Sequence, residues 1–355
     1  MRRVWAVGLV ALAGCGSERV IPLDTWRLDE TRELVLPAQV DVHAPRFTLR
    51  RTLDVPPDLR GHPLTLVIPQ IEARTTLLVG ETALEPLDDP GPGWRGERAP
   101  RWRLPATNAA SLPLTLVVEN RAPQSSRLST IPRVSATSWG DARFRAAKTI
   151  NHTGSAIAFG ALLGMFSTYA VLWFIDRSRR AYGHLALAAL CSLVSPLFWL
   201  GVTQYLFGTL ELIVVAVALA LAGFAILEFT HFHYDLPRPS RRWWQLGLVL
   251  VLLTFAAAFV PAMVRPLGSL ALLANYAVML AVAWVLVRMM RRRPAPRDVG
   301  VMSVAWMVLF LSTVPSALWR FGFANPLEGV VLTPLGMTVF LLLHGTTLSR
   351  AHVKS

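Results

Sequence analysis

Seven long apolar segments dominate the second half of the chain, and they restrict it to folds that suit a lipid bilayer. Each has about the 20 residues that an α-helix needs to cross the hydrocarbon core of a membrane. Short polar connections separate them. The segments lie at 154–175, 185–207, 212–232, 244–264, 267–287, 299–319 and 330–348. The sequence therefore predicts a seven-helix transmembrane domain over residues 151–349, followed by a short tail at 350–355.

The composition agrees with a membrane class. Hydrophobic residues make up 53% of the chain and charged residues only 16%, whereas soluble domains carry about 25% charged residues. The formal net charge is +13. The arginines cluster beside the apolar segments, which is the pattern that orients a membrane protein rather than one that binds phosphates. The lipid bilayer is thus an expected partner, and no nucleic acid is.

Lys and Arg are distributed unevenly between the two sides of the predicted domain. Thirteen of them follow the first, third, fifth and seventh segments, whereas the opposite connections hold Arg265 and Arg320. Because cytoplasmic loops carry the excess of basic residues, the N-terminal domain is predicted outside and the C-terminus in the cytoplasm of a bacterial inner membrane. The cytoplasmic basic loops include Arg177, Arg179, Arg180, Arg241, Arg242, Arg291, Arg292 and Arg293.

Residues 1–15 read as a secretion signal. Two arginines precede an apolar stretch of about ten residues, which is too short to span a membrane. The run Leu12-Ala13-Gly14-Cys15 resembles the lipobox of bacterial lipoproteins. That resemblance implies that the Cys15 thiol receives a diacylglycerol. The alternative is an ordinary signal peptide cleaved nearby, with Cys15 incidental.

Residues 16–150 have the pattern of an extracytoplasmic β domain. Leucines and valines alternate with other residues over 64–68 and 112–118, and apolar residues share one face over 47–55. Alternation with period two, bounded by Pro and Gly, is typical of strands. Several short strands at this spacing favour a β-sandwich of jelly-roll type. The predicted fold class is therefore an α+β membrane protein.

Aromatic and basic residues expected on loops are the candidates for ligand binding in this domain. Carbohydrate rings stack their C–H faces on Trp side chains, and arginines supply hydrogen-bond donors. The alternative for Trp94 and Trp102 is packing in the core or at its rim. The candidate set is Trp94, Arg95, Arg98, Trp102 and Trp139.

No metal, cofactor or catalytic group is expected. His43 and His62 are isolated in the sequence. His231 and His233 are two residues apart, so on a helix their imidazoles point in different directions. The two cysteines, Cys15 and Cys191, lack the spacing of a zinc site or a disulfide framework.

Polar residues within the spans are scarce and are functional candidates by default. Glu228, His231 and His344 lie near the predicted cytoplasmic ends of their segments. There, side chains reach the interface, and the alternative is a polar switch inside the cytoplasmic mouth. Gln204 and Asn275 lie nearer the outer half, where such residues more often hold helices together.

The layout resembles the bacterial seven-transmembrane receptors with diverse intracellular signalling modules. The resemblance rests on Leu64–Val79 (LTLVIPQIEARTTLLV), on Leu114–Asn120 (LTLVVEN) and on the connection 133–154 into the first span. It implies a galactose-binding-like jelly roll outside and a receptor function. Two departures stand out: Val79-Gly80 lacks the Asn of a Val-Asn-Gly turn, and only Ser349 to Ser355 follow the last span, without an output module.

These patterns predict a receptor-like signal transducer rather than an enzyme. Its β domain would bind a small molecule, such as a carbohydrate, and a separate cytoplasmic protein would read loops 176–184, 233–243 and 288–298. For the arginine-rich 288–298 loop the alternative is membrane topology and anionic lipid binding. The alternative functions are a membrane transporter or enzyme, which would carry several ionisable groups near the midplane, and an envelope-assembly lipoprotein.

Overall fold

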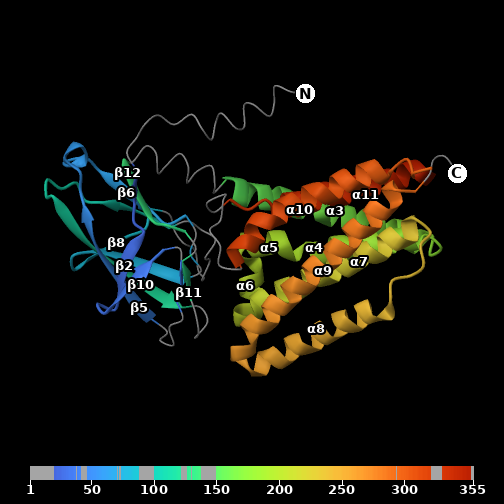
Figure 1. Ribbon diagram of the computed structural model, residues 1–355, viewed down its shortest axis with the longest axis horizontal. Coiled ribbons are helices and arrows are strands. Elements are labelled where there is room, and N and C mark those ends of the chain that lie inside the picture. Colours follow the sequence, from blue (N-terminus) through green and yellow to red (C-terminus); the bar gives the residue numbers. More distant parts are fainter. Residues whose placement is uncertain are drawn as a thin grey trace. The chain divides into compact units, whose positions relative to one another are not determined.

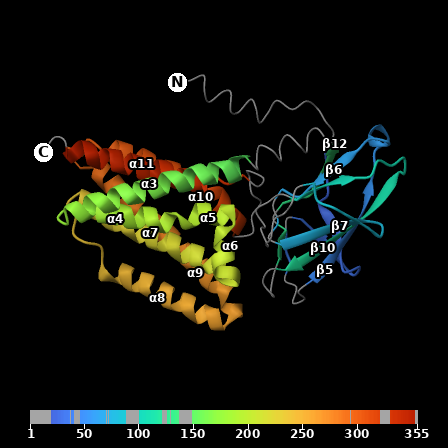
Figure 2. The same cartoon turned by 180° about the vertical axis from the view of Figure 1, so that it is seen from behind.

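The computed structural model describes residues 20–352, except 37, 41–45, 70, 72, 88–99, 121–125, 129, 137–148, 293 and 321–329. The chain divides into two compact units, one of strands and one of helices. Figure 1 labels their elements along the sequence, and Figure 2 shows them from behind. The predicted order, antiparallel β structure followed by a helical membrane domain, is confirmed.

The described strands of the first unit form three antiparallel sheets. Their orders are β3-β2-β5-β10-β7-β8, β1-β12-β6-β9 and β11-β4. The strands are β1 (Ile21–Pro22), β2 (Thr25–Leu28), β3 (Arg32–Val35), β4 (Ala38–Val40), β5 (Arg46–Asp54), β6 (Leu64–Val67), β7 (Ala73–Val79), β8 (Thr82–Leu84), β9 (Arg101–Leu104), β10 (Ser111–Asn120), β11 (Ser126–Leu128) and β12 (Arg133–Ala136), with a 3-10 turn, η1 (Pro57–Leu59).

The core of this unit follows from the alternation seen in the sequence. Leu116 of β10 pairs with Leu49 of β5 on one side and Leu77 of β7 on the other, and all three are buried. Side chains of the two larger sheets meet in one hydrophobic cluster, which also contains Trp26 and Trp102. Two sheets that bury their apolar faces against each other in this way supply the main driving force for folding of the unit.

The second unit consists of helices. They are η2 (Thr149–Thr153, a π-helical turn), α3 (Gly154–Ile175), α4 (Arg180–Ser192), α5 (Val194–Leu200), α6 (Val202–Phe207), η3 (Gly208–Leu210), α7 (Glu211–His233), α8 (Arg241–Phe259), η4 (Pro261–Met263), α9 (Val264–Met290), α10 (Val299–Arg320) and α11 (Thr333–His352). The first predicted segment, 154–175, coincides with α3.

The second predicted segment, 185–207, differs from the observed helices. It begins within α4 and continues through α5 and α6, with breaks at Leu193 and Gly201. Gly201 has a φ of 77°, in the left-handed region. That conformation ends a helix and suits glycine, which has no Cβ to clash with the backbone.

Five of the described helical stretches are long and apolar enough to cross a membrane. They are Thr149–Ile175, Arg180–Leu200, Glu211–His233, Pro266–Met290 and Val299–Ser316. Helices α8 and α11 fall outside this set. Helix α8 begins with two arginines, and α11 carries a histidine and several threonines.

Helix α7 is the centre of the bundle. It packs against α9 and α4, and most of its side chains are buried. Gly223 of α7 leaves room for Asn275 of α9, since a Cβ on Gly223 would lie 3.0 Å from the Asn275 Oδ1. Helix α8 lies at the edge of the unit in both views (Figures 1 and 2) and packs on α7 and α9. Gly247 of α8 lies against Phe224 of α7, since a Cβ on Gly247 would lie 2.9 Å from the Phe224 ring.

Candidate functional site

Polar side chains from several helices meet at one end of the bundle, which we call the arginine-rich end. Here α3 leads into α4, α7 into α8, and α9 into α10, through connections that contain most of the arginines of the helical unit. Two polar contacts lie here: His233 at the end of α7 contacts Asp298 before α10, and the Trp244 indole N–H of α8 donates to Glu228 Oε1 of α7 over 2.7 Å. The arginine-rich end is therefore where distant segments are linked by polar groups.

The first of these contacts is a hydrogen-bonded pair between the end of α7 and the residue before α10. His233 Nε2 lies against Asp298 Oδ2, and their side chains are only 10% and 25% exposed. The hydrogen bond from His233 holds the pKa of the Asp298 carboxyl below its usual value. Because Asp298 directly precedes α10, the pair fixes the beginning of that helix to the end of α7.

Aromatic rings enclose the imidazole of this pair. The Phe229 ring stacks on His233 at 5.5 Å with an interplanar angle of 19°, and the Tyr234 ring meets it edge-on at 4.9 Å. The Tyr234 hydroxyl is buried, and the described residues offer it no hydrogen-bond partner. Burial raises the pKa of Tyr234, so its hydroxyl stays protonated. An apolar enclosure of this kind strengthens the attraction between His233 and Asp298.

A second histidine joins the same group from α11. His344 is 1% exposed, and its Nδ1–H donates to the Phe340 carbonyl over 2.8 Å. Its ring lies 5.5 Å from that of Phe229, which thus separates the two imidazoles. We call Phe229, His233, Tyr234, Asp298 and His344 the histidine cluster. It connects α7, α11 and the segment before α10 through one buried aromatic ring.

The other predicted residues near this end have separate partners. Glu228 is half-buried and accepts the Trp244 bond. The His231 Nδ1–H donates to the Pro237 carbonyl over 2.6 Å, within its own connection. His231 and His233 therefore point to different partners, which agrees with their two-residue spacing. Among the described residues, the hydrogen bonds of Glu228 and His231 do not involve the histidine cluster.

The predicted polar residues toward the other end are not brought together. Gln204 lies half-buried on α6, and Asn275 lies on α9 against Gly223. The sequence reasoning missed Glu211, the first residue of α7, which is 2% exposed and accepts a short hydrogen bond from the Thr203 hydroxyl. An acid that begins an apolar run could have suggested it, since buried carboxylates need a partner.

The candidate ligand residues of the β unit have a mixed outcome. Trp94, Arg95, Arg98 and Trp139 lie outside the described residues, as do Cys15 and Arg293. Trp102 was a candidate on a loop, with packing in the core as the alternative, and the alternative is confirmed: Trp102 lies on β9 with a fully buried side chain. It pairs with Leu66 of β6 and packs in the core between the sheets. Its ring faces are therefore covered by protein.

The predicted basic residues occupy different environments at the arginine-rich end. The Arg177 guanidinium lies over the Trp173 ring at 4.1 Å. Arg179 donates to Asp176 over 2.8 Å. Neighbouring hydrogen bonds from Ser178 and Arg179 lower the pKa of the Asp176 carboxyl. The exposed remainder is Arg180, Arg241, Arg242, Arg291 and Arg292.

The histidine cluster is a set of contacts between chain segments that are distant in the sequence. The described residues contain no group of three His, Cys, Asp or Glu side chains that could hold a metal ion. The histidine cluster holds three chain segments together by the hydrogen-bonded His233–Asp298 pair and one shared ring. Asp298 and Tyr234 were not among the residues predicted from the sequence. The signal for Asp298 was its place directly before a helix, where acidic residues favour the N-terminus.

Comparison with known proteins places the helices in a described family. Residues 152–350 match the family model described as 7TM diverse intracellular signalling. The match covers α3 to α11 and so includes the whole histidine cluster. A search of curated proteins finds no match.

Proposed function

Because this chain belongs to the 7TM diverse intracellular signalling family, we propose that it is a receptor for an extracytoplasmic small molecule. The family makes it a multi-pass membrane protein with a receptor-like signalling domain. In the proposal, the β unit binds the ligand, a carbohydrate being the first class to test. The helices relay the event to a separate cytoplasmic protein, which reads the connections 176–184, 233–243 and 288–298.

The observation that carries the relay is the position of the His233–Asp298 pair. It joins two of the three connections that the partner would read, 233–243 and 288–298. A signal requires two packings of the bundle and a ligand that binds one of them more tightly. A half-buried charged pair between two connections is a suitable element for such a switch, because separating it exposes new charge at the surface that the partner contacts.

The orientation in this proposal is N-terminal domain out and C-terminus in. Its support is the excess of arginine in the connections after α3, α7 and α9 over those at the other ends of the helices. The same orientation would place the histidine cluster at the cytoplasmic face. A lipidated Cys15 would then tether the β unit to the outer leaflet. Replacing Cys15 with Ser should abolish incorporation of labelled lipid, and persistent labelling would rule out that anchor.

The experiment that tests the relay uses the full chain in nanodiscs. Spin labels are placed at Arg238→Cys and Arg297→Cys, both exposed, in a background without Cys15 and Cys191. A panel of glycans and small metabolites is first screened for a rise in melting temperature. A compound that stabilises the protein should change the distribution of distances between the two labels. The proposal is wrong if such a compound leaves the distribution unchanged, or if no compound in a broad panel stabilises the protein.

A matched variant shows whether the charged pair is the switch. Asp298→Asn removes the charge while keeping the size of the side chain. In the labelled background it should broaden the distance distribution without any ligand. If the Asp298→Asn distribution equals that of the unmodified chain, the pair does not hold the two connections together.

A further inference from the structure

An open groove lies between α3 and α4 near the arginine-rich end. Its volume is about 700 Å³. One wall is the face of α3 that carries Phe166, Ala170 and Trp173 at helical spacing, continued by Arg177 just after the helix. The other wall is the face of α4 that runs from Arg180 past Leu187 to Leu190. Both walls belong to candidate membrane spans, so the surroundings of the groove are lipid.

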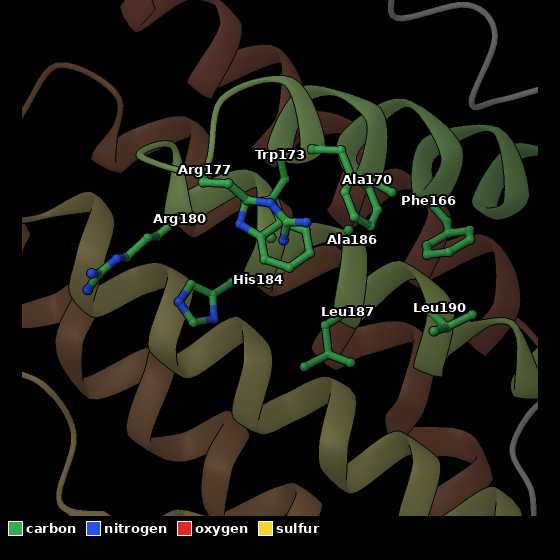
Figure 3. A pocket seen from close by; sticks show the side chains of 11 residues that line it. Phe166, Ala170, Trp173, Arg177, Arg180, His184, Ala186, Leu187 and Leu190 are labelled. Carbon is green, nitrogen blue, oxygen red and sulfur yellow. The ribbon is translucent and has the colours of Figure 1, made fainter.

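The groove is charged at one end and apolar along the rest. Arg177, Arg180 and His184 are its three polar lining residues, and Figure 3 shows them gathered at the same end, with Phe166 and Leu190 at the other. The three polar side chains lie at the same end because α3 and α4 are antiparallel and the chain turns between them there. From Arg180 to Leu190 the helix rises about 15 Å. This length fits the upper part of an acyl chain.

The arginines of the turn between α3 and α4 differ in whether a carboxylate pairs with them. Arg179 is paired with Asp176 and does not line the groove. Arg177 and Arg180 line it, and among the described residues neither has a carboxylate partner. The faces of Trp173 and Phe174 hold the Arg177 guanidinium by cation–π contacts at 4.1 and 4.4 Å. Such stacking leaves the N–H edges of a guanidinium available to an anion.

We propose that this groove binds an anionic phospholipid. Its phosphate would be held between Arg177 and Arg180, and one acyl chain would lie along Phe166, Ala170 and Leu187. Arginine recognises phosphate oxygens by paired N–H donors, and basic pockets between membrane helices bind anionic headgroups. A zwitterionic lipid fits less well, because two arginines repel its choline cation. The occupant is a lipid rather than a soluble anion, since most of the lining residues are apolar.

The test uses the indole of Trp173, which lies in the groove. The full chain is placed in nanodiscs of phosphatidylcholine that contain, at equal mole fraction, brominated phosphatidylglycerol or brominated phosphatidylcholine. Bromine on the acyl chain quenches a Trp ring in contact with it. The contribution of Trp173 is the difference between the unmodified chain and Trp173→Phe. Titration of the brominated lipid should give an apparent preference of about tenfold for phosphatidylglycerol.

Two double variants, each of which removes two positive charges, show whether the preference for phosphatidylglycerol originates at Arg177 and Arg180. Arg177→Gln with Arg180→Gln should abolish it. Arg241→Gln with Arg242→Gln removes two exposed arginines at the start of α8 and should leave it intact. Equal quenching by the two brominated lipids in the unmodified chain would overturn the proposal, as would loss of the preference in both double variants. If the Gln pair fails to fold, Arg177→Lys with Arg180→Lys keeps the charge, and a preference reduced by less than half would contradict the role of the guanidinium groups.

Discussion

At the scale of the residue, two buried tyrosine hydroxyls differ in their hydrogen bonding. Tyr169 of α3 donates its O–H to the Leu341 carbonyl of α11 over 3.2 Å. Gly345 leaves the space for that hydroxyl, since a Cβ there would collide with it. Tyr234 at the end of α7 buries its hydroxyl without a partner among the described residues. An unsatisfied buried donor costs free energy, whereas a satisfied one stabilises modestly.

Removing these two hydroxyls should therefore have opposite effects. Tyr169→Phe should lower the free energy of unfolding by about 0.5–1.5 kcal/mol, because the Leu341 carbonyl loses its donor. Tyr234→Phe should leave it unchanged or raise it by up to about 1 kcal/mol. Denaturant unfolding of both variants in the same detergent measures the difference. A clear loss of stability in Tyr234→Phe would mean that its hydroxyl has a partner.

The His233–Asp298 pair gives a stability that depends on pH. Asp298→Asn should cost about 1–2 kcal/mol near pH 6, because it removes a charged partner from a partly buried pair. The folded-state pKa of Asp298 lies below its ordinary value of 3.8. The stabilisation is therefore complete above that ordinary value and is lost as the pH falls through the folded-state pKa. The two proteins should converge in stability at the acidic end of a pH series.

Asp235→Asn is the matched control for this measurement. Asp235 is exposed, lies two residues from His233 and has a φ of 46°, which Asn tolerates as well as Asp. Its stability should stay within about 0.5 kcal/mol of the unmodified chain. If Asp235→Asn follows the same pH curve as Asp298→Asn, the effect is a general one of negative charge near His233.

The candidate residues were harder to predict from the sequence than the elements that carry them. Glu228, His231 and His344 stood out because ionisable groups are rare in apolar segments. Asp298 did not, because it lies beside Arg297 in an arginine-rich connection and its partner is 65 positions away. Trp102 was a candidate on a loop, because its place in a short strand between charged residues gave a weak alternation. A contact between residues that are far apart in the sequence produces no pattern in the sequence around either of them.

At the scale of the element, the interruption of the second apolar segment is the clearest departure from prediction. Hydropathy reads 185–207 as one span, because the residues around the breaks are apolar. The break at Gly201 depends on backbone conformation, with a φ of 77°, and hydropathy does not record it. By contrast, α3, α7 and α10 lie within a few residues of their predicted bounds. For these three helices, the length and composition of the apolar segment were sufficient to predict the bounds.

The break makes Gly201 sensitive to substitution. Gly201→Ala should lower the free energy of unfolding by about 1 kcal/mol, because an L-residue is strained in the left-handed region. Gly164→Ala in α3 is the control: its Cβ would meet nothing within 4 Å, and alanine favours the helix by up to about 1 kcal/mol. Thermal unfolding of the two variants in nanodiscs compares them. Equal stability of Gly201→Ala and the unmodified chain would show that the segment can adopt another backbone conformation at this position.

At the scale of the whole molecule, the distribution of arginine is the property that the sequence reveals most directly. By the positive-inside rule it predicts the side of the membrane on which each connection lies, without reference to any contact. The β unit and the family of the helical unit were also accessible from sequence, the first through alternation with period two and the second through the number and spacing of apolar segments. A ligand for the β unit could not be identified from the sequence, because residues on loops follow no periodicity.

Reporter fusions test the orientation of the whole chain. Alkaline phosphatase is active only where its disulfides form, outside the cytoplasm. Fused after Ser355 it should be inactive, and fused after Gly208, between α6 and α7, it should be active. A fluorescent protein that folds in the cytoplasm should give the reverse pattern. Active phosphatase at the C-terminus would exclude the proposed topology.

Helix α8 packs on α7 and α9 at the edge of the bundle, and this position sets how its sequence can change over evolution. Several of its apolar side chains are exposed, among them Leu248, Leu252 and Phe259. Any residue of similar hydropathy is tolerated at these positions, so the sequence of this exposed face should vary widely among orthologues. Gly247 faces a stricter selection, since a Cβ there would lie 2.9 Å from the Phe224 ring. In an alignment of orthologues, a larger residue at position 247 should occur together with a smaller one at position 224.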